Sequence, residues 1–207
     1  MPQLRYQLTT LTIAALLLLT ACSQTLQRQT CVELASDVSY CLAPMIGSSN
    51  KSLTVMPERS LTQKAIIKTQ ANQHELLTQL ELTSEQLTLV GLAPLGQPLF
   101  TLTYDNHQLI SEQSSLLGSQ FKAEYLLAIM QLIYWSEDSI NQHLQNGYIQ
   151  GYNCDADYCR QLYAAKQADP TAARPIVTIR YSQLDPWQAN VTLNIDAAQF
   201  ELIINPL

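Results

Sequence analysis

The chain has 207 residues, with 11 lysines and arginines against 17 aspartates and glutamates and a formal net charge of −6 at pH 7. This acidic balance disfavours binding to nucleic acid or to anionic lipid headgroups, because contacts to phosphate need clustered lysine and arginine. The roughly 180 residues that follow the N-terminal segment suffice for one ordinary domain with its own core.

The first 21 residues have the layout of a signal peptide. Arg5 precedes an apolar run over residues 11–19, which is shorter than the about 20 residues of a spanning helix. The run ends in Leu19-Thr20-Ala21-Cys22, which resembles the lipobox of bacterial lipoproteins. The alternative is an ordinary secretory peptide followed by a coincidental cysteine.

The lipobox resemblance implies that residues 1–21 are removed and that Cys22 becomes the acylated first residue. The mature chain then keeps ten basic and 17 acidic residues, a net charge of −7. Two or more acyl chains hold a protein stably to a bilayer. Because residue 23 is Ser and not Asp, the sorting rule of enterobacterial lipoproteins implies the outer membrane, facing the periplasm.

Four further cysteines follow Cys22, and an oxidising compartment favours disulfides between them. Three connectivities are open. The pairs that are close in sequence, Cys31–Cys41 and Cys154–Cys159, are the favoured ones. A zinc site is the alternative, but neither pair has the usual spacing and no histidine lies nearby, so we expect no metal.

Residues 23–30 are polar and lack an apolar period, which predicts a tether. Residues 53–112 then show apolar and polar alternation in runs at 65–71, 76–82, 87–92, 99–104 and 107–112. Turn residues separate most of these runs at spacings of about 8–12 residues, which favours an antiparallel sheet or barrel.

Residues 121–135 are apolar on nearly every face, which predicts a helix that is buried all round. Ser136 is a candidate N-cap for a second, more polar helix that ends before Gly147. Alternation returns over residues 176–181, 190–196 and 200–204, so the chain ends in strands. Residues 152–170 give no prediction.

No catalytic signature is complete in the sequence. His74-Glu75 begins a zinc-protease motif, but position 78 is Thr and the segment is predicted to be a strand. Gly47-Ser48-Ser49 is not a nucleophile elbow. We therefore expect a binding protein with no cofactor, not an enzyme.

The order of elements resembles the LolA/LolB-like fold, an incomplete antiparallel barrel whose helices cover an apolar cavity. The sharpest local match is residues 87–102, which resemble the stretch of the LolB family where two strands flank an Asn-Pro-Leu-Gly turn. In that family the leucine projects from the barrel and is needed to hand lipoproteins to the membrane. Here the turn is Pro94-Leu95-Gly96, and Ala93 replaces the asparagine.

The resemblance leaves two interpretations of Leu95: an exposed, membrane-inserting leucine, or a turn leucine folded back onto its own strands. It implies a domain order of lipoprotein signal peptide (1–21), lipidated tether and N-terminal segment (22–50), and open-barrel domain (51–207). Residues expected to line the cavity are Phe100, Leu102, Phe121, Tyr125, Ile129, Leu132 and Ile133.

Over residues 50–205 the chain also resembles an uncharacterised proteobacterial lipoprotein family that shares the pattern at 94–105. Members often occur in gene clusters for aryl polyene or fatty-acid-like products. Together these resemblances imply a protein that binds an acyl, polyene or lipoprotein lipid chain and aids its delivery to the membrane, with a periplasmic carrier or exporter as partner. The alternative is a structural or assembly lipoprotein that acts through a protein partner without a ligand.

Overall fold

The computed structural model describes residues 24–49, 52–55, 57–70, 72–117, 122–155, 157–165 and 174–207. The chain is mainly β, as predicted. The strands are β1 (Gln24–Arg28), β2 (Cys31–Ala35), β3 (Val38–Cys41), β4 (Ile46–Ser49), β5 (Ser52–Val55), β6 (Arg59–Lys68), β7 (Gln73–Leu82), β8 (Leu87–Leu92), β9 (Pro98–Tyr104), β10 (Leu109–Gln113), β11 (Leu144–Gln145), β12 (Gly147–Cys154), β13 (Asp157–Ala164), β14 (Val177–Tyr181), β15 (Val191–Ile195) and β16 (Phe200–Pro206). The helices are α2 (Ala123–Tyr134) and α3 (Glu137–His143), with short 3₁₀ helices η1 (Ser115–Leu117) and η2 (Asp196–Ala198).

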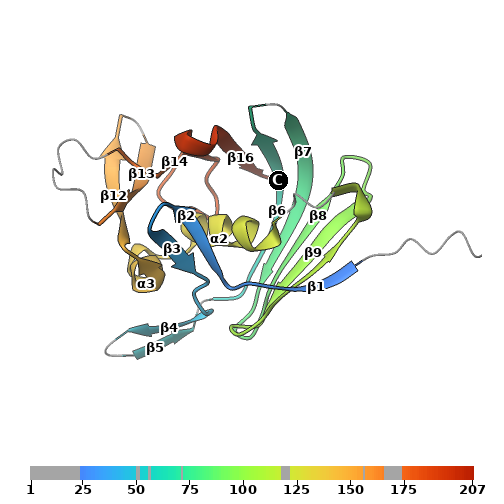
Figure 1. The fold of residues 1–207 in the computed structure, drawn as a ribbon, viewed down its shortest axis with the longest axis horizontal. Helices are drawn as coiled ribbons and strands as arrows, with labels where there is room; N and C mark the ends of the chain where they lie inside the picture. Colours follow the sequence, from blue (N-terminus) through green and yellow to red (C-terminus); the bar gives the residue numbers. More distant parts are fainter. Residues whose placement is uncertain are drawn as a thin grey trace, which may run out of the picture.

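Eleven strands form one antiparallel sheet in the order β1-β10-β9-β8-β7-β6-β16-β15-β14-β13-β12. The outermost strands, β1 and β12, do not pair with each other within the described ranges, so the sheet is not closed into a barrel. Figure 1 shows the sheet curving around α2, with β7 to β9 on one side of the helix and β12 to β14 on the other. An antiparallel sheet that buries one face in this way needs strict alternation along each strand.

The alternation predicted from the sequence appears directly in the central hairpins. On β7, Leu80 and Leu82 are fully buried. Across the ladder, Leu80 pairs with Leu89 of β8 and Leu82 pairs with Leu87. Because side chains alternate between the two faces of a strand, this register sends all four leucines to the inner face. The predicted strands at 76–82 and 87–92 are therefore confirmed.

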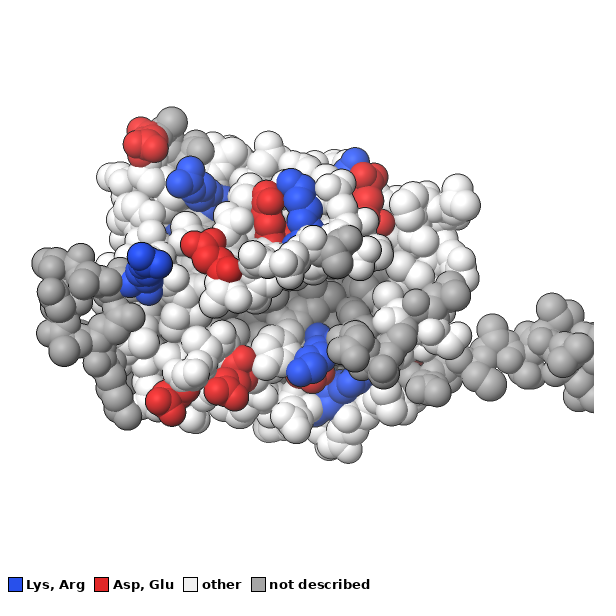
Figure 2. All heavy atoms as spheres, turned by 45° about the horizontal axis from the view of Figure 1, so that its top comes forward, with Lys and Arg blue, Asp and Glu red and all other residues white. Residues whose placement is uncertain are grey.

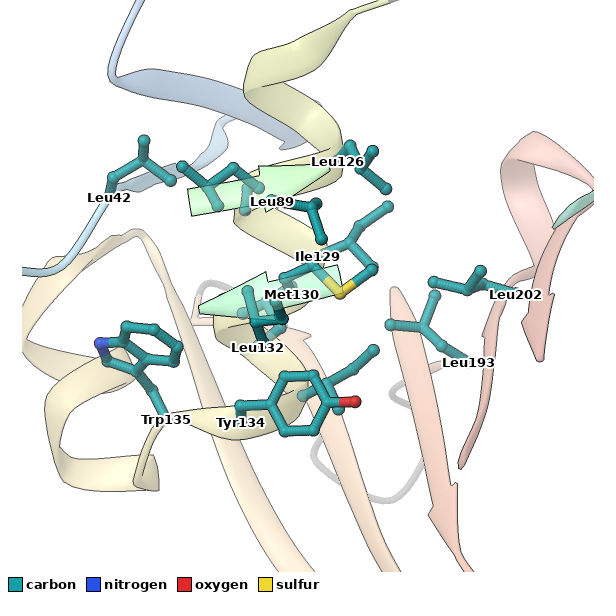
Figure 3. Close-up of a cluster of buried hydrophobic side chains, with 14 of the residues drawn as sticks. Leu42, Leu89, Leu126, Ile129, Met130, Leu132, Tyr134, Trp135, Leu193 and Leu202 are labelled. Carbon is teal, nitrogen blue, oxygen red and sulfur yellow. The ribbon is translucent and has the colours of Figure 1, made fainter. Parts of the chain in front are cut away.

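The predicted buried helix is α2, and it lies against the inner face of the sheet. Ten of its twelve residues are buried. Figure 3 shows Leu89, Leu193 and Leu202, from β8, β15 and β16, gathered with Ile129 and Met130 of the helix. No helix in the described part of the chain is both long enough and apolar enough to cross a membrane.

The second predicted helix, α3, begins where the N-cap signal placed it. Ser136 Oγ accepts a hydrogen bond from the Ser139 amide at 3.3 Å. The helix ends at His143, earlier than expected, because Leu144 and Gln145 pair with β3 as β11. The side chain of Asn141 bonds to both backbone groups of Ile149 on β12, so α3 covers part of that outer strand.

The predicted tether is wrong from Gln24 onward. β1 pairs antiparallel with β10, with Gln24 opposite Gln113 and Arg28 opposite Leu109. β2, β3 and β11 form a second sheet. No apolar period marks this strand, because an edge strand such as β1 contributes backbone hydrogen bonds and needs none. β12 and β13, which include part of the segment without a prediction, pair as an antiparallel hairpin.

Candidate functional site

The turn between β8 and β9 holds Leu95 in solvent. Ala93 and Gln97 close the turn, with the Ala93 amide donating to the Gln97 carbonyl at 2.8 Å, and the Gly96 amide donates to the Ala93 carbonyl at 2.8 Å. Gly96 has φ +81°, the left-handed conformation that a three-residue hairpin connection requires at this position. Leu95 is 98% exposed, more than any other large apolar residue that the structure describes.

The Leu95 turn lies at the same end of the sheet as the start of β1. Gln24 pairs with Gln113, Gln113 with Phe100, and Phe100 with Gly91, so all four lie on one line across the strands. With strands about 4.8 Å apart, that line spans roughly 14 Å. Cys22 itself lies outside the described residues.

Most of the residues expected to line a cavity lie instead in the packed core. Phe100, Leu102, Ile129, Leu132 and Ile133 all belong to one buried cluster with less than a tenth of their surface exposed. The ring of Phe100 covers Gly91, where an added Cβ would approach to within 2.2 Å of it. Tyr125 is half-buried at the edge of this cluster. Phe121 falls outside the described residues.

Two grooves of the described residues, of about 440 and 430 Å³, are bordered mainly by polar side chains. The first runs between the β1–β2 segment and the start of α2 and contains Tyr125. The second lies beside the β6–β7 turn and the start of β16. Neither of these two grooves is a closed apolar chamber.

Polar contacts fix α2 in its C-terminal half. The side-chain oxygen of Gln131 accepts from the Tyr40 hydroxyl at 2.8 Å and from the Ala43 amide at 2.7 Å, while its nitrogen donates to the Ala43 carbonyl at 2.9 Å. All of these groups are buried. Burial also raises the pKa of Tyr40, so its hydroxyl stays a donor. The helix therefore has one defined position against the segment that follows β3.

Residues 60–207 match the model of a family described as protein of unknown function, DUF3261. The chain belongs to the DUF3261 family. No curated protein matches it. The DUF3261 domain starts within β6 and includes the Leu95 turn and α2, whereas β1 to β5 precede it.

Arg160 of the DUF3261 domain is a buried charge that sequence reasoning missed. Its Nη1 atom donates to the carbonyls of Leu132, Ile133 and Trp135 at 2.8–3.3 Å, which are end groups of α2. Its Nε lies 3.7 Å from Glu137 Oε1. A cation at a helix C-terminus satisfies carbonyls that lack partners and complements the helix dipole. The sequence did hold one signal: Arg160 is two residues before Leu162, so on a strand both side chains lie on the same, inward face of β13.

The two disulfides among the described residues join the cysteines that were paired by proximity. Cys31–Cys41 links β2 to β3, which lie outside the DUF3261 match. Cys154–Cys159 closes the turn of the β12–β13 hairpin inside it. Among the described residues, no three His, Cys, Asp or Glu side chains are grouped so that they could hold a metal ion.

Proposed function

We propose that the chain is a lipid-anchored outer-membrane protein that aids the delivery of an acylated cargo to the membrane, with Leu95 as the membrane-inserting residue. The observation that carries the proposal is the 98% exposure of Leu95 at the tip of a fixed turn. An exposed leucine contributes little to folding. Transfer of its side chain from water into an acyl layer gains about 1.5–3 kcal/mol.

The position of the turn supports the same proposal. Under the lipobox interpretation, an acylated Cys22 stands two residues before Gln24, and Gln24 lies on the line of paired residues that also includes Phe100 beneath the turn. One leucine is too weak to hold a protein at a membrane. Beside an acyl anchor at the same end of the sheet, it needs only to perturb lipid locally.

The resemblance to the LolA/LolB-like fold supplies the cargo class, an acyl, polyene or lipoprotein lipid chain. The open sheet wrapped around α2 supports the resemblance in outline. Because the inner face is packed, such a chain would enter only where α2 separates from the sheet. Leu126 and Ile129, three residues apart on α2, keep 9% and 6% exposure, the largest values among the buried residues of the helix, so separation would begin at this face.

The packed core favours a second candidate, an assembly lipoprotein that acts through a protein partner and carries no chain. The polar anchors at Gln131 and Arg160 oppose movement of α2. Acidic and basic side chains are intermixed on the face shown in Figure 2, without a continuous patch of one sign. That face therefore offers no charged patch on which a partner or a membrane could dock.

The test compares Leu95→Glu with Leu184→Glu. Leu184 is 78% exposed and lies in the connection between β14 and β15, which is at the opposite end of the sheet. We expect both variants to fold and to be acylated normally, and Leu95→Glu alone to abolish cargo delivery. Environment-sensitive dyes on Leu95→Cys and Leu184→Cys should respond to vesicles only at position 95.

Two outcomes would remove the membrane-inserting role: equal effects of the two glutamates on delivery, or a strongly lowered melting temperature of Leu95→Glu, which would make the leucine a packing residue. Mass spectrometry of lipid that co-purifies with the acylated chain separates the two candidates. A stoichiometric acyl or polyene chain supports delivery, and its absence together with a captured protein partner supports the assembly factor.

A further inference from the structure

A groove of about 440 Å³ separates the β1–β2 segment from the first turn of α2. Its size falls within the range of about 300–1,000 Å³ that small-molecule sites occupy. Four charged side chains border it: Arg28 and Glu33 from the strands, Lys122 and Glu124 from the helix. The charges therefore balance, which favours a ligand that carries both signs over a simple anion or cation.

Glu124 has a carboxylate oxygen that forms an ion pair with Arg28 but accepts no hydrogen bond. Its carboxylate is 15% exposed, and its Oε2 atom is buried with no hydrogen-bond partner, although Arg28 Nη1 stands 4.0 Å away. The other two nitrogens of Arg28 are engaged elsewhere, since its Nε donates to Ser111 Oγ at 2.9 Å and its Nη2 to Gln113 Oε1 at 2.5 Å. A buried carboxylate oxygen without a donor is costly, and a ligand ammonium would satisfy it.

Lys122 supplies the complementary cation. It is exposed, and its Nζ atom lies 5.2 Å from the centre of the Tyr125 ring. Lys122 is also the N-cap of α2 and makes no side-chain cap. The positive end of the helix dipole and the lysine therefore face the same space, an arrangement that suits a phosphate. The Tyr125 ring, which also borders the groove, offers an apolar wall to a short methylene chain.

From these contacts we infer that the groove binds a phosphoethanolamine group, with its phosphate at Lys122 and its ammonium at Glu124. The inference rests on the proposed membrane anchor for its biological source, a phospholipid headgroup. Gln27 borders the groove and is five residues from Cys22, so an extended chain places the groove within about 17 Å of the anchor. A soluble phosphoethanolamine ester carries the same chemistry.

The test titrates the full mature chain in detergent with glycerophosphoethanolamine and follows binding by calorimetry. Glycerol phosphate, which lacks the ammonium, and ethanolamine, which lacks the phosphate, should each bind at least about tenfold more weakly. Glu124→Gln and Lys122→Met should each weaken glycerophosphoethanolamine binding by a similar factor. The matched controls are Glu75→Gln and Lys64→Met, which remove the exposed ion pair between β6 and β7; they should leave binding unchanged.

Equal binding of ethanolamine and glycerophosphoethanolamine, or no binding in variants and parent alike, would overturn the inference. Thermal melting of each variant excludes loss of fold as the cause. Vesicles of phosphatidylethanolamine, but not of phosphatidylglycerol, should protect Lys122 from amine labelling if the source is a lipid; binding of the soluble ester without this protection assigns the groove to a soluble ligand. Because Leu95→Glu should keep full headgroup binding, failure of cargo delivery and failure of this site are distinguishable.

Discussion

Replacement of Gln131 by Met tests whether α2 is fixed to the rest of the fold. Methionine matches glutamine in length and helix propensity, so the helix itself should be preserved. The change leaves three buried groups without partners: the Tyr40 hydroxyl, the Ala43 amide and the Ala43 carbonyl. Each such group costs about 1–3 kcal/mol, and partial relaxation of the Ala43 segment reduces the sum. We expect a loss of about 3–5 kcal/mol in the free energy of unfolding.

The assay is urea unfolding, supported by thermal melting. For a domain of this size, a loss of about 3–5 kcal/mol lowers the melting temperature by roughly 6–20 °C. Gln142→Met, on the exposed side of α3, is the matched control and should stay within about 0.5 kcal/mol of the parent. A double-mutant cycle with Tyr40→Phe should show coupling of about 1 kcal/mol or more, since the pair is in direct contact.

A loss below about 1 kcal/mol, or strict additivity with Tyr40→Phe, would refute the reasoning, because well-satisfied buried networks behave otherwise. Such a result would mean that α2 already separates from the Ala43 segment in solution. It would also strengthen the delivery proposal, since that proposal requires the helix to leave the sheet.

Three further predictions concern single side chains. Arg160→Met should cost about 2–4 kcal/mol in urea unfolding, because three carbonyls at the end of α2 lose their donor, and Arg160→Lys should recover only part of the loss. If Arg160→Met were neutral, the carbonyls would have another donor. Cys159→Ser removes a disulfide that closes a loop with a sequence separation of 5. It should lower the free energy of unfolding by about 2 kcal/mol relative to the oxidised parent and leave it equal to that of the reduced parent. An equal difference with and without reductant would exclude the disulfide as its cause. Burial, with a smaller contribution from Asp105, raises the pKa of Tyr104 from 10.0 to about 12. The folded pKa exceeds the unfolded one, so this contribution is complete below pH 10 and is lost as the pH rises through about 12. In that interval the parent should release about one more proton on unfolding than Tyr104→Phe, so the variant's free energy of unfolding should fall less steeply with pH. An unchanged slope would show that the tyrosine titrates normally.

Local patterns were enough to predict many of the elements and one tight turn. Alternation marked β7 and β8 because one face of each strand is buried against α2, and all-round apolarity marked α2 because the sheet curves around it. Ser136 predicted the start of α3, since an N-cap acts within one turn. Pro94 and Gly96 predicted a tight turn, and with no neighbour folded over it the leucine between them stays in solvent.

Contacts between distant segments decided the rest. β1 is mostly polar and forms only because β10, more than 80 residues later, offers an unpaired edge. Residues 24–28 show no apolar alternation that would predict a strand. Arg160 and Gln131 are polar residues on apolar faces, and only the approach of α2's carbonyls and of the Ala43 segment explains their burial.

The sequence by itself determined which face of each strand and helix is apolar, where the turns fall and which cysteines are neighbours, because these depend on spacings of a few residues. Whether the apolar faces enclose a cavity or fill it was decided by the tertiary structure alone. The same apolar side chains could line a cavity or fill a core, so their identity does not distinguish the two. The distance between α2 and the sheet decides, and it brings into contact Phe100, Leu102, Ile129, Leu132 and Ile133.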